Sequence, residues 1–214
     1  MIELNFTNNR TKEVVIEASF LGIVDFHKAV QLQSDLLAHA VKTKNNYIVG
    51  LEHPAVVTLG YRANIEQEIF ENTLPIERIS RGGLATIHSE GQLVIYPVLS
   101  LQELNIGVRD YVLLLLETTK DLLKSLGVES SVDEKAIGLY TEYGKIAFCG
   151  IQIKDGVSQH GLSLNVRNDL SLFKNIRSCG VENPAFDSLS QYGVSHTLSE
   201  IYQKWVEIFK AKLN

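Results

Sequence analysis

Hydrophobic residues recur with helical spacing in three segments of the chain. Residues 25–42, 109–126 and 198–212 each carry apolar side chains three or four positions apart, which predicts amphipathic helices. The second segment is followed by Gly127, a residue suited to a helix C-terminal cap. The third follows Thr197, and Glu200 lies three positions on, which is the spacing of a capping box. We therefore predict three helices that each bury one face.

Shorter segments between these helices have the composition of β-strands. The predicted strands cover residues 47–51, 56–59, 92–101, 136–141, 145–154 and 157–166. The last two flank Asp155-Gly156, a strong signal for a two-residue hairpin turn, which pairs Gly150 with Gly161. Two facing glycines leave a gap in the row of side chains. Either a ligand approaches there, or the glycines mark a bulge or a tightly packed helix.

The hairpin register also brings three chemically distinctive residues to one largely apolar face: Lys145, Cys149 and His160. A lysine on such a face needs a partner or a lowered pKa, and its ammonium would stabilise a nearby thiolate. The alternative is a solvated lysine after a turn. Cys149, in mid-strand, is expected to act as a small hydrophobic residue. Cys179 lies in a predicted loop, where nucleophiles are often displayed.

Composition limits the class of protein. The chain has 214 residues, 45% of them hydrophobic, so it can form a core, and no linker interrupts it. We predict a single domain over residues 1–214 with an α+β fold, a mixed, largely antiparallel sheet packed with helices. A net charge of −5 argues against nucleic-acid binding. The longest apolar run, residues 111–116, is too short to span a membrane. Two cysteines and no export signal favour the cytoplasm.

The densest group of distinctive residues is Arg81-Gly82-Gly83-Leu84-Ala85-Thr86-Ile87-His88. Consecutive glycines let main-chain N–H groups meet a ligand at short range, and the arginine, threonine and histidine add donors. The alternative is an ordinary loop. The six histidines do not stand at metal-ligand spacing with the cysteines, so no metal is expected.

Five blocks together closely resemble the lipoyl(octanoyl) transferase family. They are Glu52-His53-Pro54-x-x-x-Thr58-Leu59-Gly60, Arg81-Gly82-Gly83-x-x-Thr86-x-His88-x-x-Gly91-Gln92-x-x-x-Tyr96-Pro97, Gly144-Lys145-Ile146-Ala147, His160-Gly161-Leu162-x-Leu164-Asn165-Val166 and Cys179-Gly180. They occur in the family's order between about residues 50 and 180. The chain departs from the family at Ser89-Glu90, where Gly-Pro is usual, and at Ser178, where proline is common.

The resemblance implies the α+β fold shared with biotin and lipoate protein ligases and a cytoplasmic enzyme of protein lipoylation. It implies octanoyl transfer from acyl carrier protein to a lysine of lipoyl domains, those of 2-oxoacid dehydrogenase E2 subunits and of glycine-cleavage H protein. Cys179 matches the cysteine that carries the acyl thioester, and Lys145 matches the lysine that lowers its pKa. Three segments match the acyl site: residues 81–88, Phe148-Cys149-Gly150 and Gly161-Leu162-Ser163. Ala147, Leu162 and Leu164 are expected to line the apolar slot.

Thioester to amide transfer runs downhill, so no ATP and no other cofactor is expected. Both protein partners of the family are often acidic, which predicts a basic patch drawn from Arg81, Lys145, Lys174 and Arg177. Three other functions stay open from the sequence. They are an amidotransferase between lipoyl-bearing proteins, an ATP-dependent lipoate ligase, and a non-catalytic acyl- or lipoyl-domain-binding module.

Overall fold

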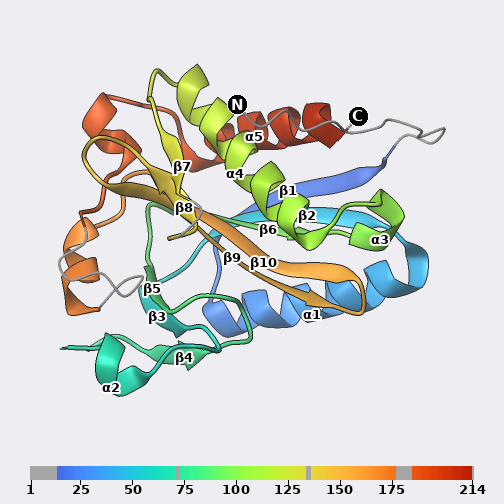
Figure 1. The fold of residues 1–214 in the computed structure, drawn as a ribbon, viewed down its shortest axis with the longest axis horizontal. Helices are drawn as coiled ribbons and strands as arrows, with labels where there is room; N and C mark the ends of the chain where they lie inside the picture. The colour runs from blue at the N-terminus through green and yellow to red at the C-terminus, as the bar shows by residue number, and fades with distance from the viewer. Residues whose placement is uncertain (1–13, 71–72, 134–135, 177–184, 214) are drawn as a thin grey trace.

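Strands and helices are interspersed along the chain (Figure 1). The computed structural model describes residues 14–70, 73–133, 136–176 and 185–213. The strands are β1 Ile16–Ile23, β2 Asn46–Glu52, β3 Val56–Leu59, β4 Ile76–Arg78, β5 Ala85–His88, β6 Gln92–Val98, β7 Ser131–Asp133, β8 Gly138–Tyr140, β9 Lys145–Lys154 and β10 Val157–Asn165. The α-helices are α1 Phe26–Thr43, α2 Ile65–Glu68, α3 Leu101–Leu104, α4 Val108–Ser125 and α5 Leu198–Leu213, with 3-10 helices η1 Leu170–Asn175 and η3 Leu189–Tyr192.

The strands form two sheets. The larger has the order β1-β2-β6-β10-β9-β8-β7, in which only β1 and β2 run parallel. The smaller has the order β4-β3-β5, with β3 parallel to β4 and antiparallel to β5. The prediction of an α+β fold with a mixed, largely antiparallel sheet is confirmed. The single domain over residues 1–214 stays a prediction.

Helices cover both faces of the larger sheet. Helices α4 and α5 pack on one face, where Leu93, Ile95 and Leu162 enter the main core. Helix α1 packs on the other face, where Ala29 meets Val94 and Tyr96. Figure 1 shows α1 and α4 on opposite sides of the sheet. Because strand side chains alternate between faces, β6 contributes to both layers.

All three predicted helices are present, with the expected ends. The Asp25 carboxylate caps α1 by accepting the Lys28 N–H at 3.1 Å. Gly127 follows α4 with φ +79°, a left-handed conformation that glycine adopts without strain. At α5, the Glu200 N–H donates to Thr197 Oγ1 at 3.2 Å, and the Thr197 N–H donates to Glu200 Oε2 at 2.8 Å. The capping box is therefore formed as its spacing predicts.

Several strands begin or end at other residues than the sequence predicts. The hairpin of β9 and β10 has the expected register, with Gly150 opposite Gly161. The strand predicted over residues 92–101 ends at Val98, because Ser100 accepts the Leu104 N–H and begins α3. The strand predicted over residues 136–141 is shortened to β8. Strands β1, β4, β5 and β7 were not predicted. β4, β5 and β7 span only three or four residues, and β1 buries only Ile16. None of the four therefore gives a clear alternation of buried and exposed side chains.

His160 interrupts the alternation of β10. Its φ is +56°, and its backbone N–H donates to Gln33 Oε1 of α1 at 2.7 Å. The ring stands edge-on to Tyr96, with centroids 6.2 Å apart, on the side of the sheet that α1 covers. The prediction that His160 shares the apolar face with Cys149 is therefore wrong, since the left-handed conformation redirects its side chain.

Candidate active site

A cavity of about 440 Å³ lies where the β9–β10 hairpin meets the segment from Ile79 to His88. Its walls include nearly all of the predicted site residues that the structure describes. These are Arg81, Gly82, Gly83, Leu84, Ala85, Thr86, His88, Lys145, Phe148, Cys149, Gly150, Gly161, Leu162 and Ser163. The tertiary structure thus brings together residues from three separate parts of the sequence.

Three predicted residues lie outside the cavity wall. Ile87 is fully buried in the small core beneath the three-stranded sheet, beside Val57. Ala147 and Leu164 are fully buried in the main core under α4, whereas Leu162 does line the cavity. Ile87 points away from the cavity because side chains alternate between the two faces of a strand. Its neighbours Thr86 and His88 therefore point toward the cavity.

Hydrogen bonds fix the backbone of the glycine pair next to Arg81. The Gly82 N–H donates to the Ile151 carbonyl at 2.9 Å, which ties this segment to β9. The Arg81 guanidinium is buried and donates through Nη2 to the Thr58 carbonyl at 2.7 Å and to Thr58 Oγ1 at 2.9 Å. A Cβ on Gly60 would lie 2.3 Å from the Gly83 carbonyl oxygen, so the two turns meet backbone to backbone.

Gly150 and Gly161 permit close approach by other backbone segments. A Cβ on Gly161 would lie 2.3 Å from the carbonyl oxygen of Ile95 on β6. A Cβ on Gly150 would lie 3.1 Å from Arg81 Cδ and 3.2 Å from the Gly82 carbonyl oxygen. Both glycines also line the cavity. Because neither has a side chain, each allows a neighbouring segment to pack closely and leaves space in the cavity wall.

Lys145 is buried at the start of β9, with 3% of its surface exposed. Its Nζ donates to the Ala136 carbonyl at 2.6 Å and to the Ile137 carbonyl at 3.1 Å. It also lies 5.0 Å from the centre of the Phe148 ring and 5.3 Å from that of Tyr140. Carbonyl oxygens and ring faces are partners for a cation. The alternative of a solvated lysine is wrong, because Lys145 contributes a buried positive charge to the cavity wall.

Three histidines and a tyrosine form a buried cluster of rings at the cavity: His53, His88, His160 and Tyr96. His53 Nδ1 lies 2.8 Å from the Val24 carbonyl and must carry the proton, so Nε2 accepts the Tyr96 O–H at 2.9 Å. Burial lowers the pKa of His53, and it lowers the pKa of His88 to about 3. Burial also lowers the pKa of His160 to about 4, with the Arg81 charge adding to the effect. These rings are neutral at pH 7.

The structure describes one of the two cysteines, Cys149. Cys149 lines the cavity, and burial raises the pKa of its thiol to about 12, despite the opposing effect of the Lys145 charge. It is therefore a neutral thiol at pH 7 and a weak nucleophile. Cys179, the predicted nucleophile, and its neighbours Ser178 and Arg177 lie outside the described residues.

The described residues on either side of Cys179 pair with the backbone of other segments. Before it, Ile176 pairs with Ile69 in an antiparallel bridge. After it, the Ala185 carbonyl accepts the Lys145 N–H at 2.9 Å, and the Asp187 N–H donates to the Lys145 carbonyl at 3.1 Å. The segment that follows Cys179 in the sequence is thus paired, at Ala185 and Asp187, with the backbone of Lys145. No local pattern in the sequence signals this connection, since it joins residues forty positions apart.

Asp187, which is fully buried, fixes the segment that pairs with Lys145. The carboxylate accepts the Ser188 N–H at 2.7 Å, the Tyr192 O–H at 2.5 Å and the Thr141 O–H. Its backbone carbonyl accepts Asn165 Nδ2 at 3.0 Å. Nothing in the sequence pattern signals this role, because two of the partners, Thr141 and Asn165, lie far from Asp187 in the sequence. Asp187 fixes the geometry of the chain beside Lys145.

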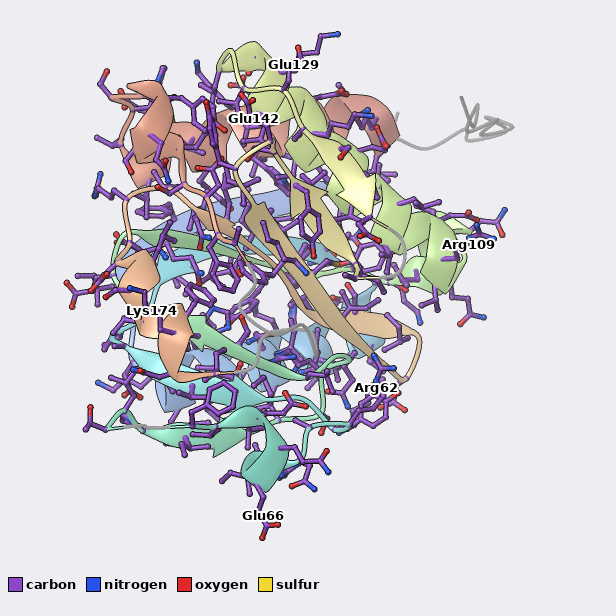
Figure 2. The ribbon with its side chains drawn as sticks, turned by 60° about the vertical axis from the view of Figure 1, so that its left-hand side comes forward. Arg62, Glu66, Arg109, Glu129, Glu142 and Lys174 are labelled. Atoms are coloured by element: carbon purple, nitrogen blue, oxygen red, sulfur yellow. The ribbon has the colours of Figure 1, made fainter. Side chains whose placement is uncertain are left out.

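The predicted basic patch is wrong for two of its members. Arg81 and Lys145 are both buried, and their cationic groups donate hydrogen bonds inside the fold. Lys174 is exposed. Arg62, which was not predicted, is exposed and lines the cavity. Figure 2 shows Lys174 and Arg62 on opposite sides of the molecule in that view, so these two do not form one patch.

Two absences concern the part of the chain that the structure describes. Within it, no three histidine, cysteine or acidic side chains come together as metal ligands. Among the helices that the structure describes, none is both long and apolar enough to cross a membrane.

Comparison with known proteins identifies the family. The model of the lipoyl protein ligase A/B catalytic domain matches residues 25–210. An octanoyltransferase of Dichelobacter nodosus is 35% identical over 193 residues, covering 90% of this chain and 96% of that protein. The octanoyltransferase of Shewanella loihica is 31% identical and covers 94% and 93%. The chain belongs to the octanoyltransferases of the lipoyl protein ligase A/B family. Its predicted class, an acyltransferase of protein lipoylation, is confirmed.

Solved structures of more distant proteins share the fold of this octanoyltransferase. A lipoate protein ligase from Thermoplasma acidophilum with bound lipoic acid superposes with a TM-score of 0.72 at 16% identity, covering 92% of this chain and 86% of that one. A Helicobacter pylori biotin acetyl coenzyme A carboxylase synthetase gives 0.55 at 14% identity, covering 92% and 75%. At these identities the likeness concerns the fold alone. The predicted resemblance to biotin and lipoate protein ligases is confirmed at that level.

Proposed function

We propose that the chain transfers octanoyl groups through a thioester on Cys179, with acyl carrier protein as donor and a lysine of lipoyl domains as acceptor. The relatives named octanoyltransferase support the acyl group. The observation that carries the route is the backbone pairing of Lys145 with Ala185. Cys179 lies six residues before Ala185, a reach of at most about 20 Å. Its thiol can therefore meet the buried Lys145 ammonium at the cavity.

The transfer divides into two balanced steps. The Cys179 thiolate attacks the thioester carbonyl carbon, a new carbon–sulfur bond forms, and the bond to the pantetheine sulfur breaks. The pantetheine thiolate leaves and takes the proton of the Lys145 ammonium, which leaves Lys145 as a neutral amine. The neutral amine of the acceptor lysine then attacks the acyl-enzyme, an amide bond forms, and the Cys179 thiolate is released. Lys145, now a neutral amine, takes the proton that the acceptor nitrogen loses, which restores the ammonium beside the Cys179 thiolate. No step needs ATP.

The cavity suits both halves of this chemistry. Val112, Phe148 and Ile151 give it apolar walls for the octanoyl chain, whose burial favours binding by about 0.8 kcal/mol per methylene. Lys145 supplies a positive charge that would stabilise a thiolate. The raised pKa of Cys149 argues against that residue as the nucleophile.

The test is the intact mass of the protein after mixing with octanoyl-acyl carrier protein. We expect the native chain to gain one octanoyl group and to pass it to an unmodified lipoyl domain, whereas Cys179→Ser gains none. Cys149→Ser is the matched control and should gain the group as the native chain does. An adduct that survives in Cys179→Ser would refute the proposed nucleophile. Modification that requires ATP and free octanoate or lipoate would point to a ligase.

Lys145→Ala separates the role of the lysine from that of the nucleophile. We expect its adduct to form at least tenfold more slowly at pH 7, because a free thiol is only a few per cent ionised there. Raising the pH toward 9 should restore much of the rate. An unchanged rate at pH 7 would show that Lys145 does not activate the thiol.

A further inference from the structure

His88 has one ring nitrogen that the fold uses and one that it leaves available. Nδ1 lies 2.7 Å from Gln92 Oε1 in a buried contact. Among the described residues, Nε2 has no hydrogen-bond partner, and the side chain lines the cavity. Nε2 is therefore the only atom of this ring that can hydrogen bond to a molecule in the cavity. The acyl-transfer route above does not use it.

A chain of buried amides determines which nitrogen carries the proton. Asn168 Nδ2 donates to Asn165 Oδ1 at 3.1 Å, and Gln92 Nε2 donates to the same oxygen at 2.9 Å. Asn165 Nδ2 in turn donates to the Asp187 carbonyl at 3.0 Å. With its nitrogen committed to Asn165, Gln92 faces His88 with its oxygen. The proton of the neutral imidazole is therefore on Nδ1, and Nε2 carries a lone pair.

The ring is also kept neutral. It is buried, and the positive charge of Arg81 and the neighbouring rings of His53 and His160 all disfavour a second proton. A group whose pKa is about 3 does not take a proton from an amine at pH 7. Nε2 can therefore accept a hydrogen bond, but it is not the base of the reaction.

We propose that His88 Nε2 accepts a hydrogen bond from an N–H group of the bound substrate, and that this group is the attacking amine of the acceptor lysine. This inference rests on the function proposed above. An octanoyl chain and a thioester contain no N–H, so the donor must come from either the acceptor amine or the amide of the pantetheine arm. The hydrogen bond orients the amine lone pair toward the acyl carbon and leaves proton removal to Lys145.

The experiment measures the two half-reactions separately. Octanoyl-enzyme is prepared, and its transfer to a lipoyl domain is followed in a single turnover. Acylation by octanoyl-acyl carrier protein is timed independently. We expect His88→Ala to slow transfer roughly tenfold or more while acylation changes less than about threefold. His88→Gln keeps an acceptor oxygen and should recover part of the transfer rate.

His53→Ala is the matched control. His53 is also a buried histidine, but both its nitrogens are used inside the fold and it does not line the cavity. We expect it to lower the thermal midpoint without selectively slowing transfer. Slower acylation alone in His88→Ala would keep an N–H acceptor but assign it to the pantetheine amide. Equal slowing of both steps, or of neither, would overturn the inference. Failure of the proposed function is distinct, because no octanoyl-enzyme would then form.

Discussion

The environment of a cysteine, more than its presence, determines its reactivity. Cys149 lines the cavity, but burial raises its pKa to about 12, so the thiol is protonated throughout the range from pH 6 to 9. We expect Cys149→Ser to keep octanoyl transfer within about threefold of native. Alkylation of native protein by iodoacetamide should be slow at Cys149 up to pH 9. Rapid alkylation there at pH 7 would contradict this assignment.

At the same scale, the sequence predicted most members of the site. The order and types of residues identified the Arg81–His88 segment, the hairpin glycines and Lys145. It could not show that the charge of Arg81 is used inside the fold, where its guanidinium donates to Thr58. A basic residue looks the same in sequence whether it is buried or exposed. Arg62 could not be predicted as a site residue either, because only the fold brings it to the cavity.

At the scale of elements, Gly50 sets how closely β2 and α5 pack. A Cβ at this position would lie 2.3 Å from the ring of Tyr202, whose hydroxyl donates to the Ile48 carbonyl at 2.6 Å. We expect Gly50→Ala to lower the free energy of unfolding by about 2 kcal/mol or more, since the buried ring must shift. Urea denaturation measures this change.

The control for Gly50→Ala is Gly107→Ala, at the N-cap of α4. There the nearest atom to an added Cβ is Asp110 Oδ2 at 3.4 Å, an ordinary contact, and φ is −68°. Its effect should stay below about 1 kcal/mol. Equal losses in the two variants would show that the Tyr202 contact does not limit the approach of α5.

For the whole molecule, the buried histidines make stability depend on pH. Burial lowers the pKa values of His53, His88 and His160 in the folded chain, whereas an unfolded histidine has a pKa of about 6.5. Below that value the unfolded chain binds more protons than the folded chain, so stability falls as the pH falls from about 6.5 toward 4. Each histidine contributes a slope of up to about 1.4 kcal/mol per pH unit.

His88→Gln isolates one part of that dependence. We expect the variant to lose less stability than the native chain between pH 6 and pH 5, by about 1 kcal/mol, whatever its stability at pH 7. Urea unfolding at pH 7, 6 and 5 gives the slopes. Parallel curves for the two proteins would show that His88 does not carry the effect.

The sequence by itself determined what depends on local pattern. Helix periodicity, the Thr197–Glu200 capping box and the Asp155-Gly156 turn act over a few residues, so the three helices and the hairpin register could be predicted. The motif blocks gave the family in the same way. Short strands such as β4 and β7 have too few residues to show a period, and they form because neighbouring strands pair with them.

Only the tertiary structure decided which groups face the cavity and in what state. The left-handed backbone of His160 turns its ring toward Tyr96, and its N–H donates a hydrogen bond to the side-chain oxygen of Gln33 on a helix far away in the sequence. The pairing of Lys145 with Ala185 likewise joins segments far apart in the chain. Burial and long-range hydrogen bonds set the charge and tautomer of a side chain, and both depend on neighbours that sequence order does not reveal.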